Sequence, residues 1–203
     1  RILEKLKLKP KSGDMKKWRR LVAKIRTVKK PVNIGIVGKY FDTGNFILAD
    51  SYISVIEAIK HAAYNLGRKP VITWINAQDF DPSTNKSYKT ALKKLGNFGG
   101  IIVPGGFGER AVEGKIQAIK YARENKIPYF GLCYGMQLAV VEFARNVVKM
   151  EKAHTTEIDP KTPYPVIDIL PEQKKLMEEK NYGGTMRLGA YTAVLKNNTI
   201  ARV

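Results

Sequence analysis

Short apolar runs alternate with segments of helical periodicity through the middle of the chain. The runs are five or six residues long and rich in β-branched and aromatic side chains, which predicts buried strands. They lie at residues 32–37, 70–75, 99–103 and 127–132. Helices are predicted between and after them, at residues 51–66, 87–95, 111–125 and 136–148. This order predicts an α/β fold with an open, mostly parallel, flavodoxin-like sheet and helices on both faces.

The ends of one predicted helix carry clear signals. Asp50 is expected as the N-cap of the helix at 51–66, and Gly67 as its carboxyl-terminal stop. After Met150 the alternation ends. Strands are expected at 164–170 and 187–195, the second followed by a turn at residues 196–199. In the helix at 111–125, Lys115 falls among the polar positions.

The single cysteine, Cys133, lies between Gly131 and Gly135, where a predicted strand leads into a predicted helix. Small residues two places either side of a nucleophile permit the sharp strand-to-helix turn that exposes its side chain. The amino end of the following helix favours a thiolate. A cysteine that merely packs in the core would need no such pattern. The sequence therefore predicts that Cys133 is a nucleophile.

A second glycine-rich turn, residues 104–108, joins the strand at 99–103 to the next helix. Such a turn offers backbone N–H groups to a phosphate or to the oxyanion of an acyl-transfer intermediate. Residues 106–111 also match the G-x-G-x-x-A pattern of dinucleotide sites, which expects an acidic residue after the next strand. That strand ends in Cys133, so an oxyanion loop is favoured. Both turns fall at the carboxyl edge of the predicted sheet, where ligands bind.

Several segments resemble the class I (triad) glutamine amidotransferases, in particular the glutaminase domain of the CTP synthase family. They are residues 104–108, 113–116, 131–137, 37–40, 50–52, 143–147, 155–157 and 183–189. The resemblance runs from about Asn33 to the end of the chain, with the motifs in order. It implies Cys-dependent hydrolysis of L-glutamine to glutamate and ammonia, with the ammonia passed to a synthetase domain for ATP-dependent amination of UTP to CTP.

The resemblance also implies roles for individual residues, with Cys133 as the nucleophile. The site for glutamine and the oxyanion is expected to comprise Gly106, Tyr134, Gly135, Met136, Gln137 and Glu157. Gly106 and the backbone N–H of Tyr134 are expected at the oxyanion, while Gln137 and Glu157 hold the α-amino and carboxylate end of glutamine. Tyr134 stands where the family usually has Leu.

The general base is not evident in this chain, which has two histidines. His61 lies within a predicted helix and is expected to be structural. His154 stands where the family usually has Asn and is not assigned to the triad. The resemblance implies that the catalytic His and Glu come from a His-Pro-Glu segment beyond Val203, so residues 1–203 alone are expected to be inactive. It implies no metal or cofactor in this domain, ATP and Mg²⁺ in the synthetase domain, and GTP as an allosteric activator.

The net charge of +18 is concentrated at the amino end. Residues 1–30 carry a net +11, and the other 173 residues carry +7. Residues 1–30 are predicted to form a short helix and then a second helix capped by Asp14. By resemblance they are a basic linker from an upstream synthetase domain, which leaves 31–203 as the amidotransferase domain. Basic segments are mostly solvated, so weak, salt-sensitive polyanion binding is favoured over specific nucleic-acid recognition. The expected partners are L-glutamine and the synthetase domain, in a homotetramer.

Composition narrows the class further. One cysteine excludes a disulfide framework and suits the cytosol, and no apolar run approaches the roughly 18 residues of a membrane span. A cytoplasmic enzyme with no membrane partner is therefore expected. Two alternatives stay open. Another cysteine hydrolase on a flavodoxin-like sheet would usually carry His after the cysteine, where this chain has Tyr134. A non-enzymatic basic scaffold is supported only by residues 1–30.

Overall fold

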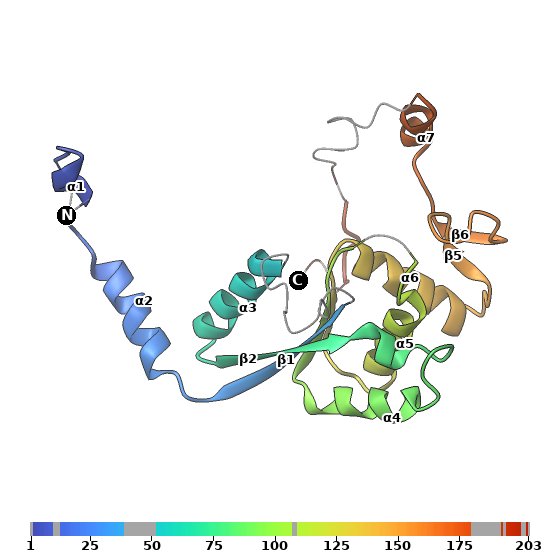
Figure 1. The fold of residues 1–203 in the computed structure, drawn as a ribbon, viewed down its shortest axis with the longest axis horizontal. Coiled ribbons are helices and arrows are strands. Elements are labelled where there is room, and N and C mark those ends of the chain that lie inside the picture. The colour runs from blue at the N-terminus through green and yellow to red at the C-terminus, as the bar shows by residue number, and fades with distance from the viewer. Residues whose placement is uncertain are drawn as a thin grey trace.

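A sheet of four parallel strands lies at the centre of the computed structural model, which describes residues 2–9, 13–38, 52–106, 109–179, 192, 194–199 and 202 (Figure 1). The strands are β1 (Pro31–Gly38), β2 (Lys69–Asn76), β3 (Gly100–Val103) and β4 (Tyr129–Gly131). Their spatial order is β2-β1-β3-β4, and all three pairings are parallel. The predicted α/β fold with a parallel sheet is confirmed.

Helices connect these strands as the periodicity predicts. They are α3 (Ile53–Asn65), α4 (Tyr88–Lys93), α5 (Val112–Glu124) and α6 (Tyr134–Asn146), with single 3₁₀ turns η2 (Ala77–Phe80) and η3 (Lys94–Asn97). The amino-terminal segment forms α1 (Ile2–Lys5) and α2 (Lys16–Thr27). After α6 come β5 (Ala153–Thr155), β6 (Tyr164–Ile167) and α7 (Pro171–Glu178), with β5 and β6 paired in parallel as a separate sheet.

The two faces of the central sheet bury different side chains, because successive residues of a strand point to opposite faces. Ile36 lies with Tyr52 and Ile59 in a small cluster under α3. On the other face, Val37 and Val103 belong to a larger cluster with buried side chains of α4, α5 and α6. Figure 1 shows α3 away from the group formed by α4, α5 and α6. Helices therefore cover both faces of the sheet, as predicted.

Two ion pairs fix α6 against α5. Arg123 binds both carboxylate oxygens of Glu142, at 2.8 to 3.1 Å, and the Glu142 side chain is almost completely buried. Arg145 contacts Glu113 at 2.7 Å. A buried carboxylate is tolerated in a protein core only when it is paired and hydrogen-bonded. These pairs therefore help to fix how α6, whose N-cap is Cys133, packs against α5.

Not every predicted boundary matches the structure. Gly67 has φ +65°, so it ends α3 in the left-handed conformation, as predicted. The N-cap of α2 is Met15, although an Asp14 carboxylate oxygen accepts from the Lys16 N–H at 2.9 Å. The cap expected at Asp50 lies outside the described residues. So does most of the strand expected at 187–195, whose described residues are not in a strand.

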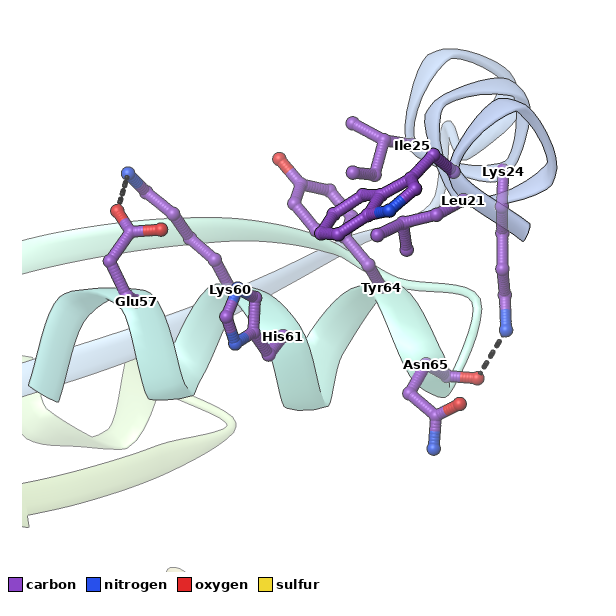
Figure 2. A pocket seen from close by; sticks show the side chains of 9 residues that line it. Leu21, Lys24, Ile25, Glu57, Lys60, His61, Tyr64 and Asn65 are labelled. Carbon is purple, nitrogen blue, oxygen red and sulfur yellow. Dashed lines mark hydrogen bonds and ion pairs between the residues drawn. The ribbon is translucent and has the colours of Figure 1, made fainter. Parts of the chain in front are cut away.

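The basic helix α2 buries none of its residues and extends away from the sheet (Figure 1). A groove of about 360 Å³ separates it from α3. Figure 2 shows Leu21 and Ile25 of α2 next to Tyr64 of α3, with the Lys24 ammonium donating to the Asn65 carbonyl oxygen at 2.7 Å. Within the described part of the chain, no helix combines the length and apolar character needed to cross a membrane.

Candidate active site

Cys133 occupies a strained turn between β4 and α6. Its φ of 50° and ψ of −108° are unusual for any residue other than glycine, and its side chain is exposed. Such strain persists only where the surrounding structure enforces it, and it is typical of a nucleophile held on a strand-to-helix turn. The backbone N–H of Gln137, in the first turn of α6, donates to the Cys133 carbonyl at 3.1 Å. The thiol therefore lies at the positive end of a 13-residue helix.

The two glycines that flank Cys133 are required by close backbone contacts. A Cβ at Gly131 would lie 2.6 Å from the Gly135 carbonyl carbon and the Met136 nitrogen. A Cβ at Gly135 would overlap the Val103 carbonyl oxygen. Backbone atoms cannot move aside as a flexible side chain can. The structure therefore supplies the physical reason for the small residues two places either side of Cys133.

Hydrogen bonds from the ends of β3 and β4 hold this turn. The Leu132 N–H donates to the Val103 carbonyl at 2.9 Å, and the Tyr129 hydroxyl donates to the Gly135 carbonyl at 2.7 Å. Burial raises the pKa of Tyr129 far above its usual value, so its phenol remains a donor at neutral pH. The turn that carries Cys133 is thus anchored to two strands of the rigid sheet.

The glycine-rich turn after β3 lies directly against Cys133. A Cβ at Gly105 would be 3.4 Å from the Cys133 Cβ and 3.9 Å from its Sγ. Gly106 follows, half-buried, and residues 107 and 108 lie outside the described part of the chain. The structure therefore brings together the two glycine-rich turns that the sequence singles out, at the carboxyl edge of parallel strands.

The loop that carries Glu157 is fixed by its neighbours. Its backbone N–H donates to the Thr155 hydroxyl at 3.3 Å. The Thr156 hydroxyl donates to Asp168 at 2.6 Å, and this bond and one from Lys174 lower the pKa of Asp168 to about 2. The Glu157 side chain itself is exposed. Sequence reasoning missed Asp168 and Lys174, which no motif marks.

Tyr134, which follows Cys133, is buried, and the charges of Glu157 and Glu109 act on it. Its side chain is 1% exposed, and its pKa is raised to about 12, first by burial and then by the negative charges of Glu157 and Glu109. Glu157 therefore lies within electrostatic range of the residue that follows Cys133. Gln137 is half-buried, and Met136 is exposed, in the same first turn of α6. The predicted site residues thus come from three neighbouring segments.

Lys115 was expected on the polar face of its helix, and that expectation is wrong. The side chain is 1% exposed, and its ammonium nitrogen lies 5.3 Å from the centroid of the Tyr134 ring. Helical spacing alone could not reveal this, because the burial comes from α6 packing over α5. No motif marks Lys115, although its ammonium lies next to the ring of the residue that follows Cys133.

The two histidines lie in α3 and in β5. His61 lines the groove between α2 and α3, in the second half of α3, which leads to the amino end of β2. Cys133 instead follows the carboxyl end of β4, and the strands are parallel, so the two residues lie toward opposite edges of the sheet. His154 lies in β5, close enough to Arg145 for that charge to lower its pKa. Arg145 is twelve residues along α6 from Cys133, about 18 Å at the usual helical rise. That His154 lies outside the triad stays a prediction.

The burial of His154 predicts a pH-dependent stability. Desolvation, and then Arg145, lower its pKa from the usual 6.5, so the unfolded chain binds this proton more readily than the folded chain. Stability is therefore expected to fall as pH decreases through about 6.5. Urea unfolding at pH 7 and pH 5 should show a smaller loss in His154→Asn than in the unmodified chain. The exposed His61→Asn is the control, and an equal loss in all three proteins would contradict the prediction.

Comparisons with known proteins agree with this geometry. The sequence profile of the family described as "Glutamine amidotransferase class-I" matches residues 47–200. The CTP synthase of Sulfurisphaera tokodaii is 53% identical over 99% of this chain and 35% of its own length. That of Pyrococcus furiosus is 50% identical over 98% of this chain and 34% of its own length. The solved structure of the glutaminase domain of Trypanosoma brucei CTPS, with bound acivicin, is also similar, with a TM-score of 0.62 and 36% sequence identity. The match covers 69% of this chain and 50% of the Trypanosoma brucei chain.

The chain belongs to the class-I glutamine amidotransferase family. Over nearly its whole length it corresponds to the glutaminase part of CTP synthases, as the sequence motifs indicate, and it spans about 35% of the length of these relatives.

Proposed function

We propose that Cys133 is the nucleophile of a glutaminase that supplies ammonia for the amination of UTP to CTP. The observation that carries this proposal is the strained, exposed cysteine at the amino end of α6, packed against the glycine-rich turn at Gly105. This arrangement combines a thiol, a helix dipole and closely spaced backbone groups, which acyl transfer requires. Neither another cysteine hydrolase nor a basic scaffold is supported by the family match over residues 47–200.

The proposed chemistry has two stages. The Cys133 thiolate attacks the side-chain amide carbon of glutamine and forms a tetrahedral intermediate. The amide nitrogen then takes up a proton, the C–N bond breaks, and ammonia leaves, so that a thioester remains on Cys133. Water then attacks the thioester, which releases glutamate and restores the thiol. Backbone N–H groups of Gly106 and Tyr134 would stabilise the oxyanion in both stages. The net reaction converts glutamine and water to glutamate and ammonia.

Other predicted residues would bind the amino-acid end of the substrate. A carboxylate is a suitable partner for an ammonium, so Glu157 would hold the α-amino group, together with Gln137 in the first turn of α6. Acivicin has the same α-amino acid end and a carbon that carries chlorine. We propose that this site binds acivicin as the Trypanosoma brucei domain does, and that the thiolate displaces its chloride.

The remaining steps belong to parts of the protein outside this chain. A histidine and a glutamate from a His-Pro-Glu segment would transfer protons to and from the reacting groups. A synthetase domain would use ATP and Mg²⁺ to activate UTP, with GTP as an activator of glutamine hydrolysis. Residues 1–30, with the exposed helix α2, would form the linker to that domain in a cytoplasmic homotetramer. The relatives' greater length, of which this chain spans about 35%, supports this arrangement.

Glu157→Gln tests the substrate-binding role. The α-ammonium of the substrate is the same in the ground state and in the transition state. Removing the carboxylate that binds it should therefore raise KM, while kcat stays within a few-fold of the value for the unmodified protein. A charge-assisted hydrogen bond corresponds to a rise in KM of about 10- to 100-fold. Steady-state glutaminase kinetics of the complete protein measure both constants.

The matched control is Glu151→Gln, which alters an exposed glutamate six residues earlier. It should leave both constants unchanged. A loss confined to kcat in Glu157→Gln would assign this carboxylate to the chemical step and contradict the substrate-binding role.

A further inference from the structure

Glu157 lies in a tight turn that directly follows β5. The Ile158 and Asp159 N–H groups both donate to the Thr155 carbonyl, at 3.1 and 3.0 Å, and the Glu157 N–H donates to the Thr155 hydroxyl at 3.3 Å. Thr155 is 2% exposed, so the turn starts from a residue fixed in the protein interior. The direction in which the exposed Glu157 side chain leaves the turn is therefore set by how the end of β5 is held.

The pairing of β5 with β6 is irregular just before this turn. His154 pairs with Pro165, and Thr155 pairs with Ile167, so β6 holds one extra residue between these two pairs. An extra residue of this kind disrupts the ladder locally, and it often redirects a side chain beside a functional site. Backbone pairing alone thus holds the end of β5 less firmly than a regular ladder would.

Thr156, the residue before Glu157, is bound twice at the carboxyl end of β6. Its N–H donates to the Ile167 carbonyl at 3.0 Å, and its hydroxyl donates to a carboxylate oxygen of Asp168 at 2.6 Å. A hydrogen bond to an ionised acceptor is shorter and roughly twice as strong as one between neutral groups. The Asp168 carboxylate therefore supplies a side-chain anchor where the strand pairing is irregular.

Both carboxylate oxygens of Asp168 are engaged by groups of this chain. The oxygen that accepts from Thr156 also accepts from the Ile169 N–H at 2.8 Å, and the other accepts from the Lys174 ammonium of α7 at 3.0 Å. With three donors in place, Asp168 connects the residue before Glu157 to β6 and to α7. Its effect on a ligand is thus exerted through Thr156 and not by direct contact.

We propose that Asp168 is a positioning residue that, through the Thr156 hydroxyl, holds the Glu157 carboxylate in place for the α-ammonium of the substrate. This inference rests on the proposed glutaminase function, in which Glu157 binds that ammonium. Asp168 sets the affinity for the amino-acid end of glutamine, while the reacting amide carbon is served by Cys133 and the backbone groups.

Two substitutions in the complete protein break the bond from either side. Asp168→Ala removes the acceptor and leaves no cavity, because the side chain is 41% exposed, and Thr156→Val removes the donor while keeping the side chain's shape. Each should raise KM for glutamine about 5- to 20-fold, of the order of one lost hydrogen bond, and leave kcat within about two-fold. Thr156→Ser keeps the hydroxyl group and should keep the KM of the unmodified protein. CTP formation from ammonium chloride should be unchanged in all three variants.

Thr162→Val is the matched control. The Thr162 hydroxyl donates to the Lys152 carbonyl at 2.6 Å, next to the opposite end of β5, so this variant breaks a bond of the same length in the same two-stranded sheet. It should leave KM for glutamine unchanged. A rise in KM equal to that in Thr156→Val would assign the effect to general loosening of this sheet and would overturn the inference.

A double-mutant cycle with Glu157→Gln tests whether Asp168 acts through Glu157. In the Glu157→Gln background, Asp168→Ala should cause no further rise in KM. An equal rise in both backgrounds would show that Asp168 acts independently of Glu157, and it would overturn the inference. An unchanged KM in Asp168→Ala, where Glu157→Gln raises KM, would overturn it as well. An unchanged KM in Glu157→Gln would instead contradict the substrate-binding role within the proposed function.

Discussion

In the complete protein, Cys133→Ala is expected to abolish CTP formation from glutamine and to preserve CTP formation from an ammonium salt. The alanine cannot form the thioester, and loss of a catalytic nucleophile typically lowers kcat by roughly 10⁴-fold or more. Ammonia added to the solution replaces the product of the lost step. The measurement is the rate of CTP formation with ATP and UTP, with either glutamine or ammonium chloride as the nitrogen donor.

The comparison of the two nitrogen donors separates chemistry from folding. A variant that unfolds would lose both activities, whereas a variant without its nucleophile loses one. The turn favours this outcome, because Cys133→Ala removes only the thiol and leaves Gly131, Gly135 and their backbone contacts intact. Retention of glutamine-dependent activity in Cys133→Ala would contradict the assignment of the nucleophile.

The second large effect concerns residues 1–203 on their own. We expect them to hydrolyse glutamine roughly 10⁴-fold more slowly than the complete protein, because the histidine proposed to protonate the departing ammonia lies outside these residues. We assign this role to neither of the chain's two histidines: His61 lines the groove between α2 and α3, and His154 lies within range of the Arg145 charge. Ammonia release is measured under saturating glutamine for both proteins.

A comparable rate in residues 1–203 would contradict this account and would indicate a base within the chain. His154→Asn then identifies it, since the loss of that activity in this variant would place His154 in the reaction. If the slow rate of residues 1–203 is unchanged in His154→Asn, the residue is structural, in agreement with its burial and with the hydrogen bond that its Nδ1 accepts from the Thr155 N–H at 2.9 Å.

Much of the fold could be predicted because one physical signal dominates it. Each of β1, β2, β3 and β4 overlaps one of the predicted apolar runs, although Val71 of β2 and Phe130 of β4 are exposed. β5 is only three residues long, and Ala153 is its one apolar residue, so no apolar run marks it although all three residues are buried. Of the elements after α6, only β6 was expected, and β5 and α7 were missed.

The candidate site divides in the same way. Cys133 and its flanking glycines carry a local backbone requirement, and a local requirement is visible in a short motif. Lys115 is buried where α5 packs against α6, and His154 lies in β5, where it is within range of the Arg145 charge. Such placements depend on contacts between segments that are distant in sequence. The hydrophobic pattern of a short stretch of sequence does not show these contacts.

The most direct test of the account is covalent labelling of Cys133 by acivicin. The thiolate should displace chloride, so that peptide mapping by mass spectrometry shows acivicin less HCl on the peptide that contains Cys133. Excess glutamine should slow the reaction, and Cys133→Ala should show no adduct at that position. Labelling of Cys133 that glutamine does not slow, or no labelling of Cys133 at all, would contradict the claim that this cysteine is the nucleophile of a glutamine site.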